Sequence, residues 1–204
     1  TEQQEESEEA ETPVIHRYTL RQILEYVKQV PMKEISFIRE AFSMNIELLE
    51  EGIHSKKTTI GPMLLRANDG KIISEDARKT AQLMCNGAIE ARVLGLSSPA
   101  MSITGSGAHG IIATMPLFAY EVIDDDILLR ATALSYLITM YIKEYSGRLS
   151  AFCGCGIAAG TGMACGLGYL RGASEAQQTM IIQNMASGLT GMICDGGNQG
   201  CAMK

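Results

Sequence analysis

The segment at residues 124–147 constrains the fold of this chain more than any other. It reads DDDILLRATALSYLITMYIKEYSG, a helical pattern that is apolar on nearly every face. Its three leading aspartates suit the positive end of a helix dipole. Its longest apolar run lies between Arg130 and Lys143 and is too short to span a bilayer. We therefore predict a buried helix at the centre of a soluble protein.

Apolar residues at helical spacing predict further helices around this one. They cover residues 19–30, 33–52, 74–95, 156–170 and 174–189. Residues 53–73 carry lysine, glycine, proline and an Asn-Asp-Gly turn signal, so we expect a loop there. Only residues 71–73 and 99–104 resemble strands. The expected fold class is all-α, a helical bundle of about six to eight helices with glycine-rich loops.

Composition supports close packing of helices. The chain has 204 residues, 46% of them apolar, which is enough to enclose a sizeable core. Aromatic residues make up only 5%, and there are 12 methionines and 21 glycines. Few large rings and many small residues suggest helices that approach each other closely. The net charge of -6 argues against nucleic acid as a partner, because phosphates require a basic surface.

Much of the negative charge lies at the start, in TEQQEESEEAETP. This stretch has no large aliphatic residue, so we predict an acidic linker or disordered tail over residues 1–17 and a helical domain over residues 18–204. It has neither the basic start nor the apolar run of a signal peptide. We therefore expect a cytoplasmic protein without a membrane partner.

A glycine fingerprint, GSGAHG, occupies residues 105–110. A dinucleotide site would need a helix and a second strand after it, but Pro116 interrupts that stretch and the following residues leave no room. The alternative is a tight loop whose backbone N–H groups bind an anion such as a substrate carboxylate. That reading makes the binding residues Gly105, Ser106, Gly107 and Gly110. His109 is a candidate general acid or base, or a histidine simply hydrogen-bonded in a loop.

The six cysteines are Cys85, Cys153, Cys155, Cys165, Cys194 and Cys201. A disulfide framework is disfavoured because the chain has no secretory signal and is too large to need one. A zinc site would be strained, because the C-x-C spacing of Cys153 and Cys155 is tighter, and the C-x₆-C spacing of Cys194 and Cys201 wider, than usual zinc spacings. A 4Fe–4S cluster fits better, because its thiolates can come from distant loops and three of them leave one iron open. Cys85 and Cys165 lie in apolar helices and are expected to be buried hydrophobes.

Three segments carry a resemblance to a known family. RLSAFCGCGIAAGTGMACGLGYL, MASGLTGMICDGGNQGCAMK and GSGAHGIIATMP are similar to the α-type domain of iron–sulfur-dependent L-serine dehydratases. The likeness is strongest to the branch with L-cysteine desulfidases and uncharacterised bacterial relatives, and it covers roughly residues 18–204. It implies a helical domain that holds a 4Fe–4S cluster through three cysteines. The implied lyase reaction is β-elimination of water from serine or sulfide from cysteine, giving pyruvate and ammonia.

The resemblance also assigns residues. It points to Cys194 and Cys201 as cluster ligands, and to Cys155 as the third because Gly154-Cys155 followed by Gly160 matches the family pattern; Cys153 is the reserve. The anion loop departs from that pattern. It has Ala108 and His109 where relatives carry Asn-Gln, which puts its substrate contacts in doubt.

The resemblance implies a missing partner as well. The α/β half that carries a Cys-Thr-Glu-Pro element in the desulfidases is absent, and the sequence ends three residues after Cys201. We therefore expect a separate subunit or a fragment of a longer chain, which could be inactive alone, with a small amino acid as substrate and a homodimer as a further option. Two other functions remain open: a non-catalytic regulatory or scaffold module, and a zinc-stabilised domain.

Overall fold

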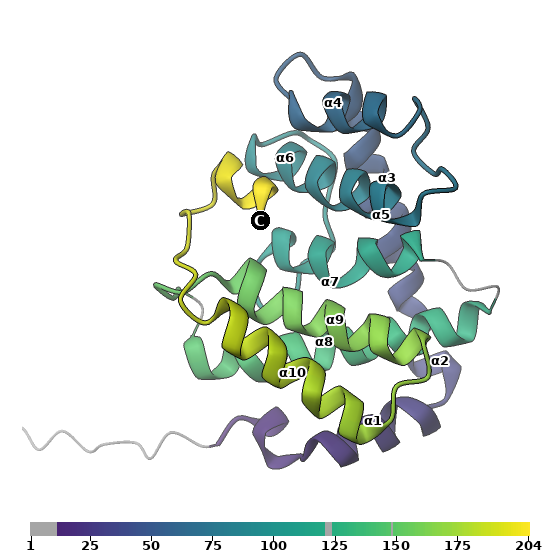
Figure 1. Cartoon of the computed structure of the whole chain (residues 1–204), viewed down its shortest axis with the longest axis vertical. Coiled ribbons are helices and arrows are strands. Elements are labelled where there is room, and N and C mark those ends of the chain that lie inside the picture. Colours follow the sequence, from purple (N-terminus) through teal and green to yellow (C-terminus); the bar gives the residue numbers. More distant parts are fainter. Residues whose placement is uncertain (1–11, 121–123, 148) are drawn as a thin grey trace, which may run out of the picture.

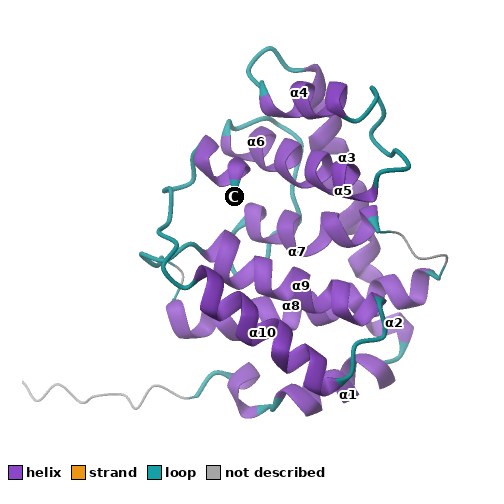
Figure 2. Cartoon of the chain, in the orientation of Figure 1, coloured by secondary structure: helices purple, strands orange, loops and turns teal. Residues whose placement is uncertain are grey.

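The computed structural model describes residues 12–120, 124–147 and 149–204 (Figure 1). Regular structure in these ranges is helical throughout (Figure 2), which confirms the all-α prediction. The α-helices are α1 (Leu20–Gln29), α2 (Met32–Ile35), α3 (Arg39–His54), α4 (Ile60–Ala67), α5 (Ala77–Gln82), α6 (Ala88–Val93), α7 (Gly107–Ala119), α8 (Asp125–Ser146), α9 (Gly160–Leu170) and α10 (Glu175–Leu189). Two π-helical turns, Leu83–Gly87 and Gly154–Ala159, lead directly into α6 and α9.

Helix α8 lies at the centre of the bundle, as its sequence predicts. It packs most extensively along α9, and also against α7 and α1. In Figure 1, α10 runs beside α9, while α5 and α6 lie on the other side of α7 with α4 beyond them. Leu129 and Leu134 of α8 are fully buried, so the helix is a core element on both sides.

Small residues allow α8 and α9 to approach closely. A Cβ atom on Gly162 of α9 would overlap the carbonyl oxygen of Ser135 and the hydroxyl of Thr139, both in α8. The gain in packing outweighs the weak helix propensity of glycine. The expectation that glycines bring neighbouring backbones together is therefore correct here.

The loop expected over residues 53–73 is wrong, because helix α4 lies within it. The N-terminus of α4 is capped from another helix: the Glu90 carboxylate of α6 accepts hydrogen bonds from the backbone N–H groups of Thr59 and Gly61, each at 2.9 Å. Pro62 falls in the first turn, where a proline costs no helical hydrogen bond. A cap supplied from a distant helix leaves no local sequence signal.

The glycine fingerprint is also more helical than predicted. Helix α7 begins at Gly107 and continues through Pro116, whose ring removes one backbone hydrogen bond. Every residue from Gly107 to Leu117 is buried, and this burial compensates for the proline. The stretch before α7 is a two-residue turn in which Thr104 and Gly105 have φ of 55° and 79°, and Ile103 pairs with Ser106.

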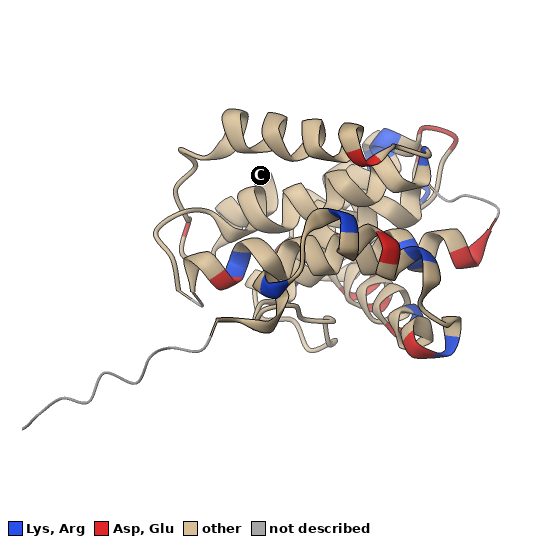
Figure 3. Ribbon diagram, turned by 90° about the horizontal axis from the view of Figure 1, so that it is seen from below, with Lys and Arg blue, Asp and Glu red and all other residues tan. Residues whose placement is uncertain are grey.

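The strands suggested at residues 71–73 and 99–104 do not form within the described residues, where the Ile103–Ser106 pair is an isolated bridge. The predicted acidic tail lies outside the described residues up to position 11, and Val14–Arg17 then forms a short 3₁₀ turn. Within the described parts of the chain, every helix is too short or too polar to cross a membrane. Figure 3 marks the positions of charged residues along the helices; in α10 the one charged residue is Glu175.

Candidate metal and substrate site

Two cysteine-bearing loops are joined by backbone hydrogen bonds. The N–H of Cys153 donates to the carbonyl of Met192 at 2.8 Å, and the N–H of Cys194 donates to the carbonyl of Ala151 at 2.9 Å. These bonds flank an antiparallel bridge between Phe152 and Ile193. The chain therefore brings the FCGCG segment and the terminal cysteine loop together, although they are about forty residues apart in sequence.

The second terminal cysteine is placed by a short 3₁₀ turn, Gln199–Met203, which packs against α6. Asn198 caps this turn, and its carbonyl accepts a bond from the N–H of Cys201 at 2.9 Å. Lys204 closes the loop, because its Nζ donates to the carbonyl of Ile193 at 2.6 Å and pairs with Asp195. Cys201 is consequently buried, while Cys194 is exposed on the glycine-rich part of the loop.

Cys153, Cys155, Cys194 and Cys201 line one open cavity of about 1000 Å³. Burial raises the pKa of the Cys155 thiol most, and the neighbouring thiols of Cys201, Cys153, Cys194 and Cys85 raise it further, in that order. All six cysteines are free thiols. The structure therefore brings together the three cysteines assigned by the resemblance, with Cys153 beside them.

Backbone N–H groups already approach two of these sulfur atoms. Gly156 donates to the Sγ of Cys153 at 3.3 Å, and Gly196 donates to the Sγ of Cys194 at 3.4 Å. Such bonds stabilise thiolates and tune metal centres. Gly196 and Gly197 have φ of 76° and 77°, and nothing lies within 4 Å of the position that a Cβ would take on either, so this loop has room to adjust.

The arrangement differs from that of a preformed single-ion site. Within the described ranges, no group of three or more His, Cys, Asp or Glu side chains could hold a metal ion as it stands. The ligands of one zinc ion must converge on a single atom, whereas the thiolates of an iron–sulfur cluster bind separate irons and lie farther apart. A donor set of cysteine thiols from separate loops is one that can also bind an iron–sulfur cluster.

The remaining two cysteines are buried, as predicted. Cys165 lies in α9 among aliphatic side chains, and burial alone raises its pKa to about 12. Cys85 lies in the π-helical turn before α6, and burial raises its pKa to about 12 as well. Unlike Cys165, Cys85 borders a second cavity of about 340 Å³ that Cys155 also lines. Sequence reasoning did not anticipate this proximity, because a π-helical turn shifts the helix register without a clear sequence signal.

His109 faces the cysteine segment from α7. Its Nδ1 lies 2.9 Å from the hydroxyl of Thr104, which itself donates to the carbonyl of Ile103 at 2.6 Å. A hydroxyl has one hydrogen, so Nδ1 is assigned as the donor and Nε2 carries the lone pair. A Cβ on Gly154 would lie 2.5 Å from this Nε2, which places the lone pair next to the FCGCG segment.

Burial lowers the pKa of His109 to about 4, with a smaller contribution from the positive charge of Lys143. The imidazole is therefore neutral at physiological pH, and the lowered pKa makes its unprotonated nitrogen a weak base. The structure shows His109 as a hydrogen-bonded residue, which was one of the two interpretations. Its role as a base stays a prediction.

The predicted anion-binding residues divide into two groups. Gly105, Ser106 and Gly107 line the cysteine cavity, where Ser106 caps α7 by accepting a hydrogen bond from the N–H of His109. Gly110 does not line it; a Cβ there would overlap the carbonyl of Met101, so this glycine serves close packing. The N-terminus of α7 thus contributes its positive end to the cavity.

Two cationic lining residues were missed by the sequence reasoning. Arg92 of α6 lies against Gly107, and Lys143 of α8 lies beside Gly154. Lys143 is only 4% exposed. The available signal was its position at the end of the longest apolar run, where a charged residue in a buried helix calls for a reason.

Comparison with known proteins gives a family match over the whole chain. The sequence profile of the family described as "Serine dehydratase alpha chain" matches residues 1–204. A UPF0597 protein of Clostridium botulinum (strain Okra / Type B1) is 44% identical over 191 residues, which are 91% of this chain and 43% of the relative. A UPF0597 protein of Clostridioides difficile (strain 630) is 38% identical over 202 residues, 97% of this chain and 47% of the relative.

The chain thus spans less than half the length of these relatives. No solved structure matches it. Full-length coverage by the family profile, together with cysteines gathered at one helical cavity, supports one assignment. The chain belongs to the serine dehydratase alpha chain family.

Proposed function

We propose that this chain is the 4Fe–4S-binding domain of a lyase that eliminates water from L-serine or sulfide from L-cysteine, giving pyruvate and ammonia. The observation that carries the proposal is the convergence of cysteines from the FCGCG segment and the terminal loop on one cavity. The family supports a serine dehydratase-like role at a coarser level. The substrate, the cluster and the lyase activity are proposals that go beyond this family-level role.

Cys155, Cys194 and Cys201 would hold the cluster, with Cys153 as the reserve ligand. When bound, a cluster with three protein ligands supplies an open iron, a Lewis acid for the leaving hydroxyl or thiol. The exposed position of Cys194 on its glycine-rich loop lets this ligand close toward the two buried ones. Thiolate formation at the buried Cys155 is costly without a metal, because burial raises the pKa of this thiol.

The chain's other residues would bind and orient the substrate. Ser106 and Gly107, at the positive end of α7, lie where a carboxylate can be held. His109 presents an unprotonated Nε2 and is the candidate acceptor for a substrate proton. In the overall change, the substrate loses its α-proton and its β-hydroxyl or β-thiol, and hydrolysis of the resulting imine releases pyruvate and ammonia.

The rest of the active site would come from sequence that lies outside the stretch that this chain shares with the relatives. They are more than twice as long as the stretch they share with it. We propose that the additional half, or a separate β-type chain, covers the cavity and supplies further substrate contacts. Free thiols fit a reducing compartment, so we place the protein in the cytoplasm.

The proposal is tested on the full-length protein after anaerobic reconstitution with iron and sulfide. We expect a visible iron–sulfur absorbance band, and release of pyruvate from L-serine or L-cysteine. Changing Cys155, Cys194 or Cys201 to serine should remove both signals, whereas Cys165→Ser should retain them. Zinc instead of iron in freshly purified protein, or absence of pyruvate from cluster-loaded protein, would contradict the proposal.

A further inference from the structure

The charges in the cysteine cavity are of one sign. The described residues that line it include Arg92 and Lys143 but no aspartate or glutamate. The whole chain, by contrast, has a net charge of -6. The charged side chains described in the lining are thus all cationic, although the protein is acidic, and such a cavity is complementary to a small anion.

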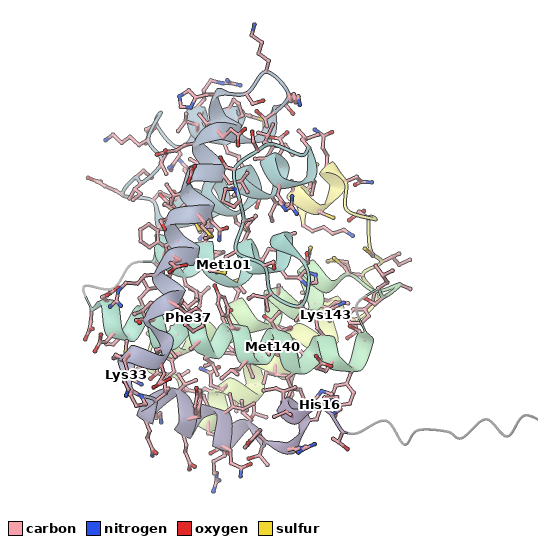
Figure 4. The ribbon with its side chains drawn as sticks, turned by 180° about the vertical axis from the view of Figure 1, so that it is seen from behind. His16, Lys33, Phe37, Met101, Met140 and Lys143 are labelled. Atoms are coloured by element: carbon pink, nitrogen blue, oxygen red, sulfur yellow. The ribbon has the colours of Figure 1, made fainter. Side chains whose placement is uncertain are left out.

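Lys143 is the more deeply placed of the two cations. It belongs to the last turns of α8, near the end of that helix (Figure 4), and its side chain is almost completely buried. Its Nζ lies 3.4 Å from the hydroxyl of Ser150 and 6.0 Å from the centre of the Phe152 ring. Its Cδ lies 3.5 Å from the position that a Cβ on Gly154 would take. The lysine stem therefore packs against the FCGCG segment itself.

The position of the ammonium group relates a ligand to the cysteines. Gly154 separates Cys153 from Cys155, so a carboxylate on Lys143 would place the remainder of a small molecule beside the buried thiols. The charge of Lys143 also reaches His109, whose pKa it helps to lower. Lysine, histidine and cysteines thus surround one space from α8, α7, the FCGCG segment and the terminal cysteine loop.

The negative end of the α8 dipole stabilises a cation at this position. A lysine near a helix end ordinarily extends its flexible stem and keeps its head in water. Lys143 instead turns its head toward Ser150 and Phe152 in the cavity wall.

We propose that Lys143 pairs with the carboxylate of the substrate and selects small carboxylates for this cavity. The inference deepens the proposed function, on which its substrate class rests. A charge-assisted bond in a partly enclosed site contributes enough affinity to separate a carboxylate from its uncharged amide. Ser150 is the positioning residue that holds the ammonium group in place.

The test measures binding rather than turnover. Pyruvate, a small carboxylate and the expected product, and pyruvamide, its uncharged counterpart, are titrated calorimetrically into reconstituted full-length protein. Lys143→Met keeps an unbranched side chain of similar length, one heavy atom shorter, and removes its charge. We expect Lys143→Met to weaken pyruvate binding by at least about tenfold and to change pyruvamide binding by less than about twofold.

Controls make the result specific. Lys33→Met removes the same formal charge from a lysine whose side chain is 80% exposed, and should leave pyruvate affinity unchanged. Ser150→Ala should weaken pyruvate binding by roughly two- to fivefold, because it loosens Lys143. Circular dichroism checks folding, and Lys143→Gln replaces Lys143→Met, with the same expected result, if the latter does not fold.

Several results would overturn the inference. They are an unchanged pyruvate affinity in Lys143→Met, an equal loss for pyruvate and pyruvamide, and no pyruvate binding by the parent protein. If Lys143→Met lowers the iron content but leaves pyruvate affinity unchanged, the lysine charge supports the cysteine site instead of a carboxylate, and the inference is overturned as well. If pyruvate binds through Lys143 but neither L-serine nor L-cysteine is converted, the lyase proposal fails while the carboxylate site stands.

Discussion

The molecule has two hydrophobic cores that are built differently. The aliphatic core, between α1, α8 and α9, is filled by large side chains and contains one cysteine; its fully buried or nearly buried members include Val27, Ile38, Leu129, Leu134 and Cys165. The cysteine core, around α6, α7 and the turn before α9, includes Met84, Met115, Cys85, Cys153, Cys155 and Cys201. Both cores contain large branched residues, but the second also includes four cysteines, three of which line the cysteine cavity.

Two cysteines of the same helical segment show what this difference means. Cys155 and Cys165 are both buried, and burial raises the pKa of each thiol. Only Cys155 is also surrounded by other thiols. Burial alone therefore does not distinguish a structural cysteine from a candidate ligand. The neighbours of the sulfur atom do.

The largest expected effect is on the packing of the cysteine core. Gly110→Ala would place a methyl group on the backbone carbonyl of Met101, which cannot move away as a flexible side chain would. We expect a loss of about 3 kcal/mol or more in the free energy of unfolding, measured by urea denaturation. A small loss would show that the cysteine core is loosely packed throughout, not only at its cavity.

Gly188→Ala is the matched control for that substitution. Gly188 lies in α10, and nothing is within 4 Å of the position of the added Cβ. Alanine has the higher helix propensity, so we expect a gain of about 0.5–1 kcal/mol. Destabilisation at both positions would mean that the close approach at Gly110 is not the cause.

A cavity in the aliphatic core should separate stability from metal binding. Leu134 is fully buried in that core, and Leu134→Ala should cost about 2–4 kcal/mol in the free energy of unfolding. Iron content per folded molecule should remain that of the parent after reconstitution. If iron falls in proportion to stability, the two cores do not act independently.

The smallest effect concerns a surface contact on the cysteine-core side. Glu51 accepts hydrogen bonds from the N–H groups of Ser97 and Ser98, and these bonds lower its pKa to about 2 from an ordinary 4.5. The folded state therefore favours the ionised carboxylate, and this stabilisation is complete above pH 4.5 and disappears as the pH falls toward 2. The Tm difference between the parent and Glu51→Gln should shrink over that range. A constant difference would exclude an ionic origin.

The aliphatic core was largely predictable from sequence, and the cysteine core only in part. Residues 124–147 show their burial directly, because apolar side chains occupy nearly every face of the helix. The cap on α4 comes from Glu90, about thirty residues away, and so escaped local reasoning. Lys143 and Arg92 also escaped it, because their shared cavity exists only after α6 and α8 have both packed against α7.

The resemblance to the family identified cysteines that the structure brings together, but it did not predict which contacts hold them there. Two features hold them: the pairing between Phe152 and Ile193 and the 3₁₀ turn at Gln199–Met203. No residue spacing in the sequence marks either of them. Gly110 belongs to the same fingerprint as Gly105, and the structure gives the two different surroundings. A motif therefore marks a region, and packing decides which of its residues face the site.

The central claim is that the neighbours of a buried thiol, rather than its burial, make a cluster ligand. The most direct measurement is iron per polypeptide after anaerobic reconstitution of the parent, Cys155→Ser and Cys165→Ser, determined side by side on full-length protein. The account predicts about four irons in the parent and in Cys165→Ser, and a several-fold lower value in Cys155→Ser. Equal iron in the two variants would contradict it.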